Sequence, residues 1–339
     1  MGVQLVQAAL DATDFQTAER AIQETGANWG ESHDWYWQGL RCHWRVLGAE
    51  DARPLVLLHG FGASSAHWRH NAAPLKAAGF RVYSLDLIGF GASAQPGLKH
   101  YRRLDNRLWG KQLAAFLEQI VRASPSQQAV LIGNSLGALT ALTTAAFRPD
   151  LVGAVVAAPL PDPALVEPLT FRPTRWGSRL KQKLIAIICR LLPLELIVPL
   201  IARTPLLKAA LQMGYHHSIQ FDHELLHLIA QPARRPSAAR ALRAMCVGMT
   251  LRPVGCTAPR LLKRLASRPD RPPILLLWGR EDRFVPLKIG QRLQHQYPWT
   301  TLSVLDETGH CPHDESTQGF DQAVLSWLNL NLGNDQQRA

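Results

Sequence analysis

The sequence predicts an α/β fold, in which a mostly parallel, doubly wound sheet of about eight strands carries an inserted helical cap. The first observation is a series of short apolar runs, each closed by a glycine or a polar turn and separated from the next by a helix-length stretch. The runs lie at 54–60, 81–89, 129–135, 151–159, 274–279 and 301–309. The second observation is a long gap without a comparable strand between the fourth and fifth runs. Strands that alternate with helices form parallel sheets, and function collects beyond their carboxyl ends.

Two segments precede the first apolar run. Residues 3–24 carry apolar positions at loosely helical spacing, which predicts a peripheral helix within an N-terminal extension of residues 1–30. Residues 34–48 alternate aromatic and polar side chains on either side of Gln38-Gly39. This alternation is typical of an antiparallel hairpin, so the sheet is expected to begin with two antiparallel strands.

The gap after the fourth run predicts the cap. Its leucine, isoleucine and alanine runs are broken by prolines, which indicates several short helices. We expect residues 160–256 to form a helical cap or lid, and residues 1–159 and 257–333 to form the core. The polar residues 334–339 are expected to form a flexible tail.

The composition is that of a globular, reduced protein. Hydrophobic residues make up 47% of the 339 residues and charged residues 19%. The five cysteines are odd in number and contain no CxxC pair, which argues against a disulfide framework or a zinc knuckle. The first residues lack the basic start and apolar core of a signal peptide, so we expect a cytoplasmic location.

The net charge of +11 is concentrated in the predicted cap. Thirteen basic and five acidic residues between 160 and 256 give that segment a net charge of +8. No nucleic-acid recognition module is present, so nucleic acid is not the expected partner. The apolar run 184–201 is interrupted by Arg190, Glu195 and two prolines and is not expected to span a bilayer. We expect peripheral contact of the cap with an anionic membrane; the alternative is that the apolar run packs over the site while the charges keep the cap in solution.

The segment Gly133-Asn134-Ser135-Leu136-Gly137 is the central chemical motif. It matches G-x-S-x-G and lies directly after an apolar run and before a helical stretch. This context is required of a nucleophile elbow, whose sharp turn exposes the serine oxygen between small residues. Ser135 is therefore the candidate nucleophile, and the alternative is a plain glycine-rich strand-helix turn.

A serine nucleophile needs a base and a group that orients the base. His310 follows the strand-closing Gly309, and Asp282 follows the run at 274–279, which gives the chain order Ser, Asp, His that this elbow accompanies. His313 is a nearby rival for the base. Glu281 and Asp162 are rivals for the acid, because Asp162 follows the preceding strand and could reach the same histidine.

The remaining element of such a site is an oxyanion hole. Its donors are the backbone N–H after the nucleophile and one from the loop after the third strand, which here are Leu136 and Phe61. Residues 59–64 form a glycine-rich loop whose backbone can approach a ligand closely. This chemistry requires neither a cofactor nor a metal.

A competing motif belongs to another enzyme class. His223-Glu224-Leu225-Leu226-His227 matches H-E-x-x-H, which on a helix can bind zinc through its two histidines. A catalytic zinc needs a third protein ligand, and residues 228–269 contain no Asp, Glu or His. A zinc peptidase is therefore the remote alternative. A non-catalytic binding protein built on the same scaffold is a further one.

At these residues the chain resembles the α/β-hydrolase superfamily over roughly Trp35 to Leu328, and within it the pheophytinase-like serine hydrolases of plants and cyanobacteria. The resemblance lies in GFGASSAHWRHN, DLIGFGAS, GNSLGALTAL, HHSIQFDHELLHLIAQPARRPSAA, WGREDRFVP and TGHCPHDE. Two positions depart from it: His59 stands where the plant enzymes have a proline, and Ala138 replaces a second glycine.

The resemblance implies an α/β-hydrolase fold and a serine hydrolase that cleaves a hydrophobic carboxylic ester through an acyl-enzyme. It implies a tetrapyrrole pigment as partner, with the phytyl ester of pheophytin or another chlorophyll derivative as the substrate. It also implies an association with thylakoids if the source is photosynthetic. The alternative is a general carboxylesterase or lipase-like hydrolase of an unknown small substrate.

Overall fold

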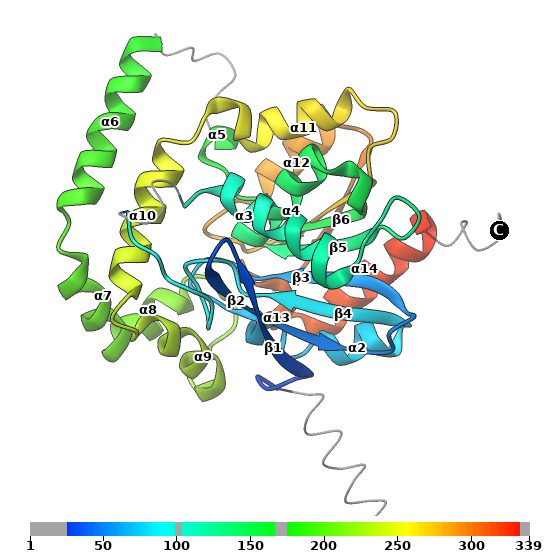
Figure 1. Cartoon of the computed structure of the whole chain (residues 1–339), viewed down its shortest axis with the longest axis horizontal. Coiled ribbons are helices and arrows are strands. Elements are labelled where there is room, and N and C mark those ends of the chain that lie inside the picture. Colours follow the sequence, from blue (N-terminus) through cyan, green and yellow to red (C-terminus); the bar gives the residue numbers. More distant parts are fainter. Residues whose placement is uncertain (1–25, 99–103, 167–174, 333–339) are drawn as a thin grey trace, which may run out of the picture.

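The computed structural model describes residues 26–98, 104–166 and 175–332, and its centre is one eight-stranded sheet (Figure 1). The strands follow the order β1-β2-β4-β3-β5-β6-β7-β8. Their bounds are Glu31–Trp37 (β1), Leu40–Leu47 (β2), Arg53–Leu58 (β3), Phe80–Leu85 (β4), Ala129–Asn134 (β5), Val152–Ala158 (β6), Ile274–Gly279 (β7) and Thr300–Leu305 (β8). From β4 to β8 all neighbours are parallel, and β1 and β2 are antiparallel. The predicted α/β-hydrolase fold is confirmed.

The antiparallel edge begins with the expected hairpin. Gln38 and Gly39 connect β1 to β2 with φ values of 51° and 75°. Two consecutive left-handed residues make the type of turn whose twist matches that of paired strands. The hairpin pairs with β4 through β2, which leaves the central strands β3, β5, β6 and β7 covered on both edges.

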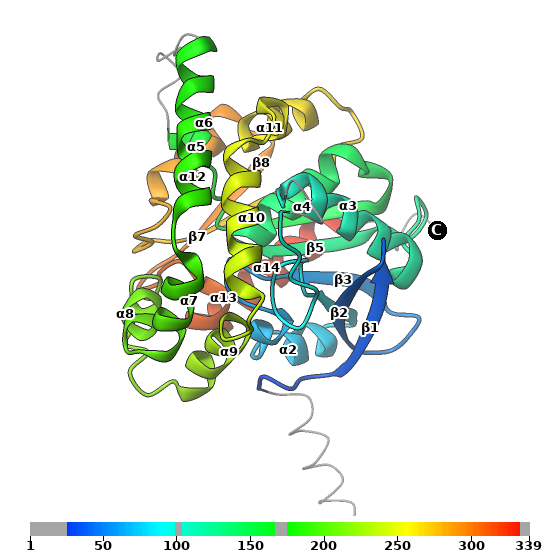
Figure 2. The same ribbon diagram turned by 60° about the vertical axis from the view of Figure 1, so that its left-hand side comes forward.

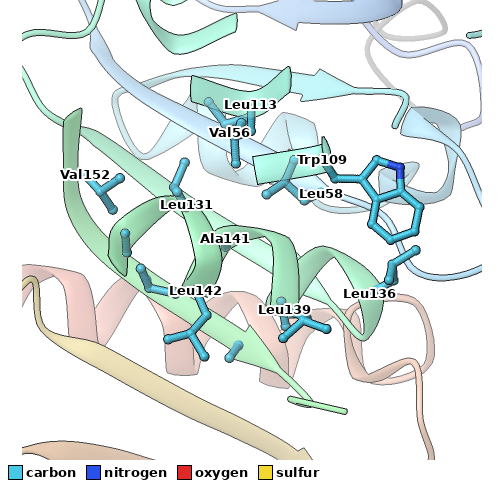
Figure 3. Packing of buried hydrophobic residues seen from close by; sticks show 14 of the residues in the cluster. Val56, Leu58, Trp109, Leu113, Leu131, Leu136, Leu139, Ala141, Leu142 and Val152 are labelled. Carbon is cyan, nitrogen blue, oxygen red and sulfur yellow. The ribbon is translucent and has the colours of Figure 1, made fainter. Parts of the chain in front are cut away.

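Helices cover both faces of the sheet, and the central strands are buried on both sides. In β3, Val56 and Leu58 face α3 (Asn106–Phe116) and α4 (Leu136–Phe147), whereas Leu55 and Leu57 face α2 (Ala72–Ala77) and α14 (Thr317–Leu332). Strands buried on both faces read as continuous apolar runs, which explains the sequence signal. Figure 3 shows α4 lying on this core beside Leu58 and Leu131.

The remaining short elements connect these layers. They are η1 (Ser65–Trp68), η2 (Leu117–Val121), η3 (Pro149–Leu151), α11 (Ala258–Ala266), α12 (Leu287–Gln296) and α13 (Pro312–Glu315). The segment α11 packs against α4, and α12 packs against β7 and β8, so both belong to the core.

The expected helical insertion lies between β6 and β7 (Figure 2). Its elements are α5 (Pro163–Val166), α6 (Arg175–Leu191), α7 (Leu194–Arg203), α8 (Leu206–Gln212), α9 (His223–Ala233), α10 (Ala238–Thr250) and η4 (Val254–Cys256). No strand lies in the described part of this insertion. The domain limits of 160 and 256 stay a prediction. The expected N-terminal helix at 3–24 and the tail at 334–339 lie outside the described residues.

A buried carboxyl joins α14 to the loop before α2. Asn71 donates from Nδ2 to Asp321 Oδ1 at 2.9 Å and to the His313 carbonyl at 3.1 Å. Burial raises the pKa of Asp321 to about 7, and the Asn71 hydrogen bond opposes this shift. In the unfolded chain the same carboxyl titrates near its ordinary pKa of about 4.

Replacing Asp321 by asparagine should therefore stabilise the fold at alkaline pH. Below about pH 4 the Asp321 carboxyl is protonated in both the folded and the unfolded chain. As pH rises from about 4 to 7 it ionises first in the unfolded chain, so the free energy of unfolding of the wild type falls, and the loss is complete above about pH 7. Asp321→Asn keeps an oxygen acceptor for Asn71 and has no charge to bury. Urea unfolding should show that the stability of Asp321→Asn relative to wild type is greater at pH 8 than at pH 5. The exposed Asp51→Asn should show no such increase. A pH-independent difference for Asp321→Asn would contradict the assignment.

Candidate active site

Ser135 lies at the turn between β5 and α4, in a backbone conformation that non-glycine residues rarely adopt. Its φ is 51° and its ψ is −112°. Glycines on both sides allow the turn to be this tight. A Cβ at Gly137 would lie 2.1 Å from the Leu58 carbonyl oxygen, and a Cβ at Gly133 would lie 2.3 Å from the Gly137 carbonyl carbon. The strand-turn-helix context expected for the G-x-S-x-G motif is therefore present.

His310 and Asp282 meet at the carboxyl ends of β7 and β8. His310 Nδ1 lies 2.9 Å from Asp282 Oδ2, and the two side chains are 12% and 0% exposed. The other oxygen, Asp282 Oδ1, accepts from the backbone N–H groups of Phe284 at 2.8 Å and Val285 at 2.9 Å. Because these bonds fix the carboxylate, they also orient the His310 ring, which lines the cavity described below.

The rival acids have other partners. Asp162 is buried beside Arg252, whose Nη2 lies 2.5 Å from Asp162 Oδ1, and it accepts from the Ala258 N–H at 2.7 Å. Glu281 accepts from the Thr308 N–H at 2.9 Å. Asp162 therefore joins the end of the cap to the core, and Glu281 joins the loop after β7 to the loop after β8.

One side chain ties the serine turn to the histidine loop. Asn134 Nδ2 donates to the Ala158 carbonyl at 2.7 Å and to the His310 carbonyl at 3.0 Å. The His310 N–H in turn donates to the Gly214 carbonyl of the cap at 2.7 Å. The residue just before Ser135 in the motif thus holds the backbone of His310 to the serine turn, a role that the sequence pattern alone did not indicate.

Ser135 and His310 line the same cavity, which has a volume of about 600 Å³. Its wall comes from the loop after β3, from α3, from residues 88–90, and from the cap helices α7 to α10. Among the described residues that line it there is no Asp, Glu, Lys or Arg. The chamber therefore suits an apolar, uncharged molecule.

Of the two candidate oxyanion residues, one lines the cavity and the other follows Ser135 directly. Phe61 lines the cavity, and Leu136 is the first residue of α4, where helix N–H groups have no partner within the helix. A Cβ at Gly60 would lie 2.5 Å from Asn134 Oδ1, so the loop approaches the serine turn closely. The assignment of these two N–H groups as oxyanion donors stays a prediction.

His59, which departs from the resembled enzymes, fixes that loop. Its Nδ1 lies 2.8 Å from the Gly60 carbonyl, and its Nε2 accepts from the Leu87 N–H at 3.1 Å. Burial lowers the pKa of His59, so the ring stays neutral with Nδ1 as the donor. A proline could not make these two bonds.

The H-E-x-x-H segment lies on α9 and serves another purpose. His223 and His227 are exposed, whereas Glu224 accepts from Arg69 Nη1 at 2.9 Å and from the Ala27 N–H at 2.8 Å. Within residues 26–98, 104–166 and 175–332, no three His, Cys, Asp or Glu side chains are grouped as a metal site would require. The glutamate is an ion-pair partner that joins α9 to the core.

His313, the rival base, is wholly buried and belongs to the packing. Its ring centroid lies 4.2 Å from that of Trp68 in a tilted arrangement, and its Nε2 lies 3.3 Å from His67 Nδ1. Burial lowers the pKa of His313 well below its usual value. Removing this ring would leave a cavity under η1, so its replacement by alanine should destabilise the fold even though it spares the chemistry.

A buried network fastens the cap to the core near this histidine. Asp314 accepts from Arg69 Nε at 2.9 Å and from the Tyr215 hydroxyl at 2.9 Å. Arg69 also binds Asp222, the N-cap of α9, at 2.5 Å. Burial alone raises the pKa of Asp314, but hydrogen bonds from His67 and Arg69 hold it well below the usual value. The carboxylate is therefore charged, and its neighbours come from both layers.

Comparison with known proteins decides the family. The model of the Alpha/beta hydrolase family matches residues 55–323. The chain belongs to this family. It is 27% identical over 298 residues to the 2-hydroxy-6-oxononadienedioate/2-hydroxy-6-oxononatrienedioate hydrolase of Cupriavidus pinatubonensis, covering 85% of this chain and 91% of the relative.

Other relatives of the family cleave esters. The chain is 26% identical over 294 residues to the pimeloyl-[acyl-carrier protein] methyl ester esterase of Vibrio cholerae, covering 85% of this chain and 98% of that one. A thermophilic esterase from Thermogutta terrifontis superposes with a TM-score of 0.64 at 19% identity, over 88% of this chain and 98% of that chain. Hydrolase activity is therefore expected of the α/β-hydrolase chain described here.

The two aspartates should respond differently to neutralisation. Asp282→Asn removes the charge that orients His310 and stabilises its cation, and should lower kcat for a short acyl ester by about 10⁴-fold. Asp162→Asn should leave kcat per folded molecule within about twofold of wild type but lower the unfolding temperature, because it leaves Arg252 buried and unpaired. Kinetics and thermal unfolding of both variants measure this. A severe kinetic defect in a folded Asp162→Asn protein, with Asp282→Asn active, would reverse the assignment.

Proposed function

We propose that this α/β-hydrolase is a serine hydrolase that cleaves an uncharged, hydrophobic carboxylic ester through an acyl-enzyme. The observation that carries the proposal is the oriented His310–Asp282 pair at the wall of the apolar cavity that Ser135 also lines. A hydroxyl becomes a nucleophile only beside a base held in one tautomer, and this pair supplies such a base.

The first half-reaction follows from the positions of these groups. His310 Nε2 takes the proton of Ser135 Oγ as the oxygen attacks the ester carbonyl, and Asp282 stabilises the imidazolium that forms. The N–H groups of Phe61 and Leu136 donate to the developing oxyanion. His310 then gives the proton to the leaving alcohol, and the acyl group stays on Ser135.

The second half-reaction repeats these roles with water. A water molecule loses a proton to His310 and attacks the acyl carbonyl, the oxyanion again binds to the two N–H groups, and Ser135 leaves with the proton. The products are a carboxylic acid and an alcohol. Because His310 carries the proton in each step, the proposed reaction needs no cofactor.

The lining of the cavity favours one substrate class. A carboxylate or phosphate on the substrate would lose its hydration there, and the described lining offers no cation to replace it. The dienedioate named for the Cupriavidus relative is a dicarboxylate, whereas the methyl ester named for the Vibrio relative has its reacting carboxyl masked. An uncharged ester with a long apolar group fits this lining best.

The phytyl ester of pheophytin, or of another chlorophyll-derived pigment, is the specific ester that the resemblance of TGHCPHDE suggests. An isoprenoid chain is uncharged and apolar, and so it is compatible with the apolar lining of the cavity. A general carboxylesterase or lipase-like hydrolase that accepts many hydrophobic esters is the second candidate, and the two esterases described above favour it. Product analysis with pheophytin beside simple acyl esters distinguishes the two.

Loss of the nucleophile or the base should abolish ester turnover. Ser135→Ala removes one oxygen at a turn that glycine neighbours already permit, so the protein should stay folded while kcat falls about 10⁴-fold or more. His310→Ala should match it. Steady-state hydrolysis of a neutral acyl ester, with circular dichroism to verify folding, measures this. Near wild-type turnover by folded Ser135→Ala protein would contradict the proposal.

Substrate charge should matter more than substrate length. We expect kcat/KM to rise with acyl chain length as methylenes enter the cavity, by about threefold per methylene or less. A carboxylate at the far end of the same acyl chain should lower kcat/KM by about 10²-fold, because the charge is buried without a partner. A matched pair of a neutral acyl ester and its ω-carboxylate measures this. Faster turnover of the dicarboxylate would contradict the substrate class.

A further inference from the structure

The outward side of α6 carries large apolar side chains. Leu180, Leu184, Ile187 and Leu191 are 70%, 56%, 48% and 77% exposed. At about 100° per residue these four lie within about 60° of one another on the helix. The buried Ala186 lies on another side of the helix, which packs against α10 (Figure 2). This distribution is the reverse of that on a helix of a soluble core, whose large apolar residues face inward.

The apolar surface continues onto α7, where Leu196 and Leu200 are also exposed. We call the following exposed residues of the two helices the outer cap face: Leu180, Leu184, Ile187, Ile188, Leu191, Leu196 and Leu200. Figure 1 shows α6 at the outer edge of the molecule, with α10 on its inner side. Monomeric proteins rarely expose so many large apolar side chains together unless the surface binds something.

Charge accompanies this surface. Lys183 and Arg190 are exposed and seven residues apart, so they lie on one flank of α6, and Arg203 is exposed at the end of α7. The sequence of α6 contains no acidic residue, and that of α7 contains only Glu195, which pairs with Arg243. A surface that is apolar with cationic flanks is complementary to an anionic bilayer, into which the apolar side chains insert while the bases meet lipid phosphates.

Other arginines of the cap are used internally. Arg235 Nη1 donates to the carbonyls of Gly91 and Ser93 at 2.8 and 2.9 Å, and Arg234 Nε donates to the Ala202 carbonyl at 3.1 Å. Reversing these two charges would disturb contacts within the protein. Among the described side chains of α6, the charges beside the outer cap face are Lys183 and Arg190.

The part of the outer cap face that α7 carries lies directly behind the wall of the cavity. Val198 and Ile201 of α7 line the cavity, while Leu196 and Leu200 of the same helix are exposed. On α8, Leu211 likewise lines the cavity and Met213, just beyond its end, is exposed. At α7 and α8 one layer of helix thus separates the cavity from the outer surface, whereas α6 lies outside α10.

The geometry of α6 and α7 favours a helix pair that lies along a membrane surface over one that crosses the membrane. No single described helix is long and apolar enough to cross a membrane. The segments Gln182–Leu191 and Leu194–Arg203 reach that length and apolar composition only as a pair, and a bend of 69° separates them. Each segment has the length of about 15 Å, half the thickness of the hydrocarbon layer.

We propose that the outer cap face binds the surface of an anionic phospholipid bilayer and holds the cavity wall of α7 and α8 against it. Apolar insertion supplies the part of the affinity that resists salt, and Lys183 and Arg190 supply the part that salt removes. That the membrane then delivers a dissolved ester to the cavity rests on the proposed function, whereas the binding itself does not.

Vesicle flotation with phosphatidylglycerol–phosphatidylcholine and with pure phosphatidylcholine tests the binding. Wild type should float with anionic vesicles and weakly with neutral ones. Leu184→Glu with Leu191→Glu should weaken anionic binding about tenfold or more. Lys183→Gln with Arg190→Gln should weaken it by roughly fivefold per charge at low salt and little at high salt. The matched controls are Leu330→Glu, exposed on α14, and Arg260→Gln with Lys263→Gln on α11.

Hydrolysis of a short water-soluble ester by the α6 variants separates binding from catalysis and should equal that of wild type, because none of the four residues lines the cavity. Folded Ser135→Ala protein should float like wild type, so a failure of the proposed function leaves this test intact. The proposal is overturned if wild type ignores both vesicles, if it binds them equally, or if the controls lose as much binding as the α6 variants. It is also overturned if the wild type is a dimer that Leu184→Glu with Leu191→Glu makes monomeric, since a second copy then covers the face.

Discussion

The site of this α/β-hydrolase depends on how closely the chain packs where β5 turns into α4. The turn brings the start of α4 onto the end of β3, with no room for a side chain at Gly133 or Gly137. It forces Ser135 into a backbone conformation with positive φ. Such strain persists only where the surrounding structure fixes it. Here that structure is the doubly buried β3–β5–β6 core. Its consequence is a half-buried serine at the carboxyl end of β5 and at the N-terminus of α4.

The neighbouring groups are held around that turn by hydrogen bonds. Asn134 holds the His310 loop, and His59 holds the loop that carries Phe61. The cap takes part as well, since the Gly214 carbonyl accepts from the His310 N–H. A displacement of the cap would therefore act on the position of His310 through this hydrogen bond. The bond links the cap wall of the cavity to the proposed base.

Much of this could be predicted from the sequence, because the central strands are apolar runs closed by chemistry-bearing turns. The elbow, the order Ser135, Asp282, His310, the hairpin and the helical insertion all follow from local patterns. Pattern alone left Asp162 open as the acid, since both aspartates follow strands, and only the contact with Arg252 accounts for it. The Arg69–Asp314 network joins residues 245 positions apart, and the outward side of α6 depends on which helix face finds a partner; neither relation is local.

The most direct measurement of the central claim is the site of reaction with a fluorophosphonate, a reagent that phosphonylates an activated serine. Peptide mapping by mass spectrometry should find one adduct, on Ser135, and its rate of formation should fall by several orders of magnitude in folded His310→Ala protein. An adduct on another residue, or labelling of Ser135 at an unchanged rate without His310, would contradict the account.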